Sequence, residues 1–218
     1  MFAIPGLYEE VVQRRLGCRT PERVAALLAA AAERSGEAPA GGEAPGLDRK
    51  APGRGRRAAL RVLDAGAGNG VSGDALAAAG LDPVVGLDLE PAARDAALRD
   101  RPGRYGAYLV ADLAALAPAE EAVIRAARPQ ALACVGSVGG GHLPPAAVVA
   151  GLDLLEPPAL LAYAFDVGRG PDPLREVLAG VPELARERYV HRRTVTGGER
   201  VWEAVVTQAG LRALPKSG

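Results

Sequence analysis

The feature that most constrains the fold is an alternation of strand-like and helix-like segments from Leu60 onward. Five short apolar runs have the character of buried strands, and each is followed by a helical segment that starts near a proline or glycine. The predicted strands are 60–64, 83–88, 105–111, 131–137 and 159–167, and the predicted helices are 70–79, 91–100, 118–128, 144–155 and a short one near 173–179. Strands separated by helices of this length pair in parallel through right-handed crossovers. The sequence therefore predicts an open, doubly wound α/β sheet.

The end of the chain departs from this alternation. Two β-rich runs, 187–196 and 200–208, flank Gly197-Gly198, a pair typical of hairpin turns. We therefore expect a mostly parallel, seven-stranded sheet that ends in an antiparallel hairpin. Within the hairpin, Trp202 is expected to pack in the core and His191, in a charged run, to lie at the surface.

The N-terminal part of the chain is expected to be helical and separate from the sheet. Residues 8–16 are amphipathic, and Thr20-Pro21 resembles a helix N-cap followed by proline at the first helical position. Residues 35–57 are rich in glycine, proline and charge without apolar periodicity, which indicates a flexible loop. The predicted organisation is a helical lid segment at 1–34, this loop at 35–57 and one main domain at 58–218.

Composition limits the possible partners. Lys+Arg and Asp+Glu both total 26, so the formal net charge is zero, whereas nucleic-acid binding draws on an excess of Lys and Arg. No apolar run is long enough to span a bilayer, and the N-terminus lacks a signal-peptide pattern, so a cytoplasmic location is expected. Cys18 and Cys134 form no paired motif, which argues against a zinc site or a disulfide scaffold. The oligomeric state, monomer or homodimer, is left open.

The sequence Asp-Ala-Gly-Ala-Gly-Asn-Gly at residues 64–70 follows the first predicted strand and opens a helix. Glycines at alternate positions let the backbone turn tightly and approach a ligand. A dinucleotide site is one interpretation, because Gly68, Gly70 and Gly73 satisfy the GxGxxG spacing. An S-adenosylmethionine site is the favoured one. Asp64 would repel a pyrophosphate but can accept a hydrogen bond from an ammonium group, and the turn itself spans Gly66, Ala67, Gly68 and Gly70.

Further candidate residues follow the next strands, where open α/β sheets bind ligands. Asp88 ends the second strand and can accept hydrogen bonds from both ribose hydroxyls, with Leu89 under the adenine ring. Asp112 follows the third strand and can accept from the adenine amino group, with Leu113 beside it. Ser137 ends the fourth strand and is expected to lie in the same site. Each acid alone could equally be a solvated turn residue, but their combined order favours the ligand site.

With these motifs in this order, the chain from residue 60 to about 208 resembles class I S-adenosylmethionine-dependent methyltransferases. A narrower resemblance is to the methyltransferase-like proteins named after the Williams–Beuren syndrome region, through Tyr8, the step Leu-Gly-Cys-Arg-Thr-Pro at 16–21, and Gly-His-Leu-Pro-Pro at 141–145. The loop at 35–57 departs from that pattern. The resemblance implies S-adenosylmethionine as methyl donor, S-adenosylhomocysteine as product and no metal. The neutral charge disfavours a nucleic-acid substrate, so we expect a small molecule that is methylated on a hydroxyl, carboxyl or amine, and the composition, typical of a GC-rich genome, suggests secondary metabolism.

Methyl transfer from a sulfonium needs alignment more than a nucleophile from the protein, although a hydroxyl or protonated amine substrate also needs a base. His142 follows the fourth strand at the expected substrate entrance and is the candidate base; alternatively it only pins its glycine-rich loop. Tyr8 could close over the donor or be an ordinary helix residue. The alternative function is a protein of this fold that binds S-adenosylmethionine without transferring its methyl group, while catalysing another reaction such as a cyclisation.

Overall fold

The computed structural model describes residues 2–34, 59–139, 142–194 and 196–209. The predicted loop at 35–57 lies outside the described residues. The helical elements are η1 (Glu9–Arg15), α1 (Thr20–Arg34), α2 (Val71–Ala78), α3 (Pro91–Asp100), α4 (Pro118–Ala127), α5 (Pro145–Leu152) and η2 (Val167–Arg169). The strands are β1 (Arg61–Ala65), β2 (Asp82–Asp88), β3 (Ala107–Val110), β4 (Ala131–Cys134), β5 (Leu160–Asp166), β6 (Glu183–Arg193) and β7 (Glu199–Gln208).

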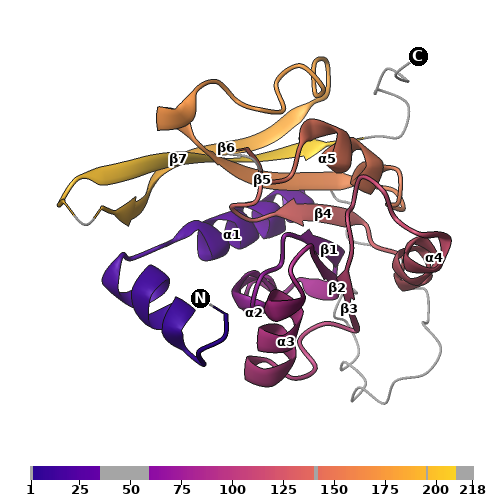
Figure 1. The fold of residues 1–218 in the computed structure, drawn as a ribbon. Coiled ribbons are helices and arrows are strands. Elements are labelled where there is room, and N and C mark those ends of the chain that lie inside the picture. Colours follow the sequence, from indigo (N-terminus) through magenta and orange to yellow (C-terminus); the bar gives the residue numbers. More distant parts are fainter. Residues whose placement is uncertain (1, 35–58, 140–141, 195, 210–218) are drawn as a thin grey trace, which may run out of the picture.

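The strands form one seven-stranded sheet in the order β3-β2-β1-β4-β5-β7-β6. β1 to β5 pair in parallel, and β7 pairs antiparallel with both β5 and β6. The long hairpin of β6 and β7 extends from the edge of the sheet in Figure 1. This arrangement confirms the predicted doubly wound sheet with a C-terminal antiparallel hairpin.

Helices cover both faces of the sheet, as parallel pairing requires. On one face, α1 and α2 pack against β1, β4, β5 and β7 through a buried cluster that includes Val24, Leu28, Val62 and Leu76. On the other face, α4 and α5 pack through a cluster that includes Ile124 and Leu152. Figure 1 shows α3 beside α2. The carboxyl ends of the central strands stay uncovered by these helices, which is where ligands bind in such folds.

The N-terminal region divides into two parts with different roles. Helix α1 is part of the core, because its apolar face packs against the sheet and Leu28 is fully buried. The preceding η1 is a π-helix, with a hydrogen bond from the Leu16 N–H to the Val11 carbonyl, and none of its residues is buried. Any lid role therefore belongs to the residues before α1.

The prediction of a short helix near 173–179 is wrong, because the structure forms successive turns there. Hydrogen bonds of helical spacing alternate with tighter ones, since the Leu178 N–H donates to the Leu174 carbonyl but Ala179 donates to Glu176. The Asp172 carboxylate accepts from the Leu174 N–H and the Tyr163 hydroxyl, which fixes the start of these turns.

Among the described residues, no helix is long and apolar enough to cross a membrane.

Candidate functional site

The glycine loop after β1 is held in a conformation that only glycine fits. Gly66, Gly68 and Gly70 all have positive φ, at 74°, 55° and 87°, where residues with a Cβ are strained. A Cβ at Gly66 would come within 2.4 Å of the Ser137 Cβ. The Gly66 and Ala67 N–H groups both donate to the Leu87 carbonyl, which ties the loop to the end of β2. The tight turn predicted from the glycines is therefore formed.

Asp88 joins the glycine loop to the end of β2. One carboxylate oxygen accepts from the Gly68 N–H at 2.9 Å and the other from the Glu90 N–H at 3.0 Å. The Tyr108 hydroxyl donates to the Gly68 carbonyl at 2.5 Å on the other side of the loop. Each Asp88 oxygen keeps a second lone pair, so the carboxylate can still accept from a ligand.

Asp64 lies beneath the glycine loop with none of its surface exposed. Its Oδ2 accepts from the Ser72 hydroxyl at 2.6 Å and the Tyr105 hydroxyl at 2.7 Å. Its Oδ1 is buried and has no partner within the described residues. Burial raises the pKa of Asp64 to about 6, because the two hydroxyl hydrogen bonds only partly offset the loss of water and the Asp88 charge raises it further. The carboxylate thus anchors the loop, and its predicted contact with an ammonium group stays a prediction.

A cavity of about 640 Å³ opens over the loop at the carboxyl ends of β1, β2, β3 and β4. Ten of the sequence-predicted residues line it, whereas Asp64 and Gly70 do not. Gly70 instead precedes the first residue of α2. The ten residues are Tyr8, Gly66, Ala67, Gly68, Asp88, Leu89, Asp112, Leu113, Ser137 and His142. We call this space the first cavity.

Two of these residues, Asp112 and Ser137, bond to nearby backbone, and a third, Leu89, offers open surface. The Asp112 carboxylate accepts from the Ala114 N–H at 2.9 Å and is otherwise exposed. The Ser137 hydroxyl donates to the Ala65 carbonyl at 2.7 Å, so its role is to hold the strand end under the loop. Leu89 is 62% exposed, which leaves an apolar surface free at the rim of the cavity.

The N-terminal segment is tied to the rim of the first cavity. Glu9 accepts from the Asn69 side-chain amide at 3.0 Å and from Arg101 at 2.6 Å. Tyr8 stacks on Phe2 with ring centroids 6.2 Å apart. Burial raises the pKa of Tyr8 to about 12, so its hydroxyl keeps its proton at neutral pH. Residues 60 positions apart in the chain therefore form one wall of the site.

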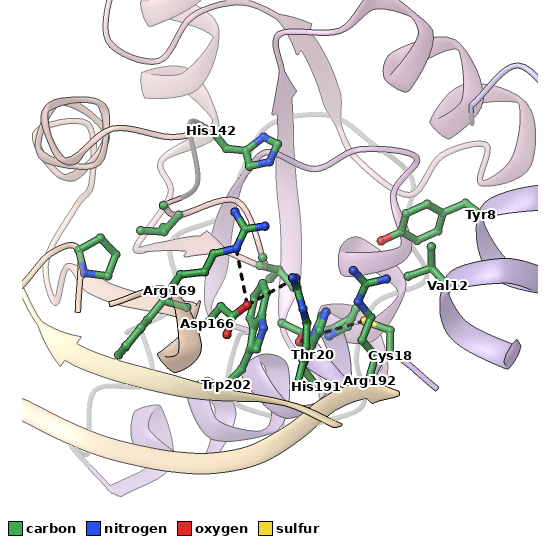
Figure 2. A pocket seen from close by; sticks show the side chains of 18 of the residues that line it. Tyr8, Val12, Cys18, Thr20, His142, Asp166, Arg169, His191, Arg192 and Trp202 are labelled. Carbon is green, nitrogen blue, oxygen red and sulfur yellow. Dashed lines mark hydrogen bonds and ion pairs between the residues drawn. The ribbon is translucent and has the colours of Figure 1, made fainter. Parts of the chain in front are cut away.

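A second cavity has a volume of about 440 Å³, and Figure 2 shows side chains that line it. Tyr8, Pro21, Val135, Gly136 and His142 line both cavities. The His142 side chain is exposed and makes no hydrogen bond within the described residues, while the backbone N–H of the residue donates to the Gly139 carbonyl. The two cavities meet along this shared wall.

The floor of the second cavity comes from the C-terminal hairpin. His191 stacks on Trp202 with ring centroids 4.0 Å apart and an interplanar angle of 13°. The expectation that His191 lies at the surface is wrong: it is 9% exposed, and its Nδ1 lies 2.5 Å from the Thr20 hydroxyl oxygen. Trp202 packs against the core cluster beneath α1, as expected, and also lines the cavity, which was not expected. Burial first, and then the Arg192 charge, lower the pKa of His191 to about 4.

No protein-family model matches the chain, and no curated protein matches it. Several solved structures, however, do match the chain. A protein from Pyrococcus horikoshii described as a candidate RNA methyltransferase aligns with a TM-score of 0.55 at 12% identity, over 90% of this chain and 86% of that one. The 1,6-didemethyltoxoflavin-N1-methyltransferase of Burkholderia thailandensis aligns with a TM-score of 0.51 at 16% identity, over 87% and 79%. A methyltransferase from Anabaena variabilis, dependent on S-adenosylmethionine, aligns with a TM-score of 0.52 at 12% identity, over 69% and 77%.

The position of β7 decides between the two folds considered for the glycine loop. A dinucleotide-binding sheet has the order 3-2-1-4-5-6 with its strands parallel, whereas here an antiparallel β7 lies between β5 and β6. The chain has the fold of class I methyltransferases. The narrower resemblance to the Williams–Beuren subgroup stays a prediction.

Proposed function

We propose that this chain is an S-adenosylmethionine-dependent methyltransferase that acts on a small molecule. The observation that carries the proposal is the Asp88 carboxylate, which faces the first cavity while holding the glycine loop through Gly68. A carboxylate at this point suits a ligand with neighbouring hydroxyls such as a ribose, and the antiparallel β7 is what sets the fold apart from a dinucleotide-binding sheet. The second cavity adjoins the first along a shared wall, so it gives the acceptor molecule a place of its own.

The proposed donor site uses the residues that line the first cavity. Asp88 would accept from the ribose hydroxyls, each such bond contributing about 1.5–3 kcal/mol because the acceptor is charged. Asp112 would accept from the adenine amino group, with Leu89 and Leu113 against the ring. Asp64 has no exposed surface and does not line this cavity, so its part in the donor site would be to hold the glycine loop, and a direct contact of its unpartnered Oδ1 with the ammonium group would need the loop to shift.

When bound, S-adenosylmethionine supplies an electrophilic methyl group and leaves as a neutral thioether. The protein's own residues hold the two molecules in adjoining cavities and exclude water, and such alignment can lower a barrier by roughly 7–11 kcal/mol. His142 lies on the wall shared by both cavities. As the proposed base, it would take the proton of a hydroxyl as the oxygen bonds the methyl carbon, or the proton of an ammonium group before the nitrogen lone pair so freed bonds that carbon.

Thermal unfolding with S-adenosylmethionine, S-adenosylhomocysteine and NADH in separate samples tests the donor site. A ligand at 100 times its dissociation constant stabilises a protein by about 2.7 kcal/mol. We expect a shift with the two sulfur ligands and none with NADH. Asp88→Ala should weaken both sulfur ligands at least ~10-fold by titration calorimetry, and Asp95→Ala, on the exposed face of α3, should not. A shift with NADH alone would refute the proposal.

Transfer is tested separately from binding. Incubation with methyl-labelled donor and a small-molecule extract should move label into a new product and release S-adenosylhomocysteine, and His142→Gln should slow this without weakening donor binding. The alternative function, donor binding beside a different reaction such as cyclisation, instead predicts binding with all label left in S-adenosylmethionine.

A further inference from the structure

The second cavity is unusually rich in positive charge for a chain with no net charge. Arg169, Arg192 and Arg200 line it against a single acid, Asp166, among the described residues. Three positive charges against one negative leave two in excess. Arg169 is exposed, but Arg192 and Arg200 are half-buried, and such charge is costly unless it is paired, so the cavity as it stands favours a ligand of negative charge.

Ion pairing within the cavity leaves one of its three arginines without an acidic partner among the described residues. Asp166 Oδ2 lies 3.7 Å from Arg169 and 3.5 Å from Arg200, and Asp166 Oδ1 accepts from the Gly168 N–H. Arg192 is half-buried and has no ion-pair partner within the described part of the chain. Its guanidinium presents several donors in a fixed planar fork, which matches a carboxylate or phosphate.

The charge of Arg192 acts on the interior of the cavity. Burial raises the pKa values of Tyr8 and Cys18, and the Arg192 charge lowers them in part. At His191, burial and the Arg192 charge both lower the pKa. Figure 2 shows the Arg192 guanidinium and the Tyr8 hydroxyl directed into the same space. With its pKa near 4, His191 is neutral at pH 7, so it offers a ring surface and not a further charge.

The remaining walls suit a flat molecule. His191 and Trp202 form a stacked aromatic floor, and Phe165 and Val138 add apolar surface. Trp202 is half-buried, so part of its ring is open to a ligand in this cavity.

We propose that the second cavity binds a planar small molecule with an acidic group, a carboxylate or a phosphate monoester, and that the Arg192 guanidinium holds this group. The inference rests on the proposed function, because it names the class of molecule that would stand beside the donor. Arg192 acts here as a specificity-determining residue, while Tyr8 and His142 lie on the wall toward the first cavity.

The chain contains one tryptophan, Trp202, and because it lines the second cavity its fluorescence can report on binding there. We would titrate the full chain, with saturating S-adenosylhomocysteine and at constant ionic strength, with benzoate, phenyl phosphate and the neutral benzamide. Saturable changes are expected with at least one of the two anions, and benzamide should bind at least ~10-fold more weakly. The tighter of the two anions identifies the acidic group. Equal binding of benzamide, or no binding of either anion, would overturn the proposal without any variant.

The matched variants are Arg192→Met and Arg193→Met. The two arginines are neighbours on β6, but Arg193 is exposed and does not line the cavity. Arg192→Met should weaken the anion ~10- to 100-fold, and Arg193→Met should leave it unchanged. An Arg192→Met protein that binds the anion like wild type would refute the assignment. Calorimetry with S-adenosylhomocysteine on the same samples separates the outcomes, because loss of that binding would count against the donor site instead.

Discussion

Replacing Asp64 with asparagine gives a pH-dependent test of the buried carboxylate beneath the glycine loop. Burial raises its pKa from 3.8 to about 6, against the hydrogen bonds from Ser72 and Tyr105. The folded protein therefore holds a proton that the unfolded chain has already lost between these two pH values. Because the folded state binds more protons there, the free energy of unfolding falls as pH rises from about 4 to 6 and is then level.

The magnitude follows from the two pKa values. A rise from 3.8 to about 6 is a shift of about 2.2, and at 1.36 kcal/mol per unit it lowers stability by about 3 kcal/mol at neutral pH relative to pH 4 or below. Asparagine cannot ionise, so the variant lacks this loss. Its amide donor at the unpartnered Oδ1 position has a cost of its own, but that cost does not change with pH.

Urea unfolding followed by Trp202 fluorescence, at a series of pH values from about 4 to 8, measures the difference. The stability of Asp64→Asn minus that of wild type should rise by about 3 kcal/mol between pH 4 and 7 and then level off. Asp153→Asn, at an exposed position, serves as the control and should follow the wild-type curve. A flat difference for Asp64→Asn, or one that falls with pH, would refute the buried, raised-pKa carboxylate.

Two further substitutions test the loop and the core. Gly66→Ala should destabilise the protein by about 1–3 kcal/mol from positive φ alone, and by more because the new Cβ would meet Ser137; Gly80→Ala, with φ +82° and open space around it, isolates the first effect. Donor binding should be lost with Gly66→Ala only, and calorimetry that finds it intact would count against the loop as the binding site. Leu28→Ala should cost ~2–5 kcal/mol in urea unfolding because α1 is part of the core. Leu27 is half-buried, so Leu27→Ala should lower the free energy of unfolding by less than Leu28→Ala. Equal small losses of stability at both positions would mean that α1 only covers the surface.

Most of the sheet was predictable because its signals are averaged over many residues. Each parallel strand is a short apolar run between helix starts, and the observed β2 (Asp82–Asp88) and α3 (Pro91–Asp100) lie within one residue of the predicted 83–88 and 91–100. The glycine loop and Asp88 were predictable for a similar reason, since both lie at strand ends that this alternation locates. The turns at 173–179 were not, because their start has the same signature as a helix: Asp172 accepts from the Leu174 N–H as an N-cap residue does, with Pro173 after it.

The second cavity could not be predicted, because it depends on a single irregularity in strand pairing. Val190 pairs with Val201 and Arg192 with Arg200, so His191 is an extra residue in β6. In a regular strand, neighbouring side chains point to opposite faces, but here His191 and Arg192 both line the cavity. A bulge of this kind redirects side chains locally and leaves no mark in the hydrophobic pattern of its own strand. Sequence periodicity thus locates the proposed donor site, whereas the charge that would select the acceptor depends on one inserted residue in the hairpin.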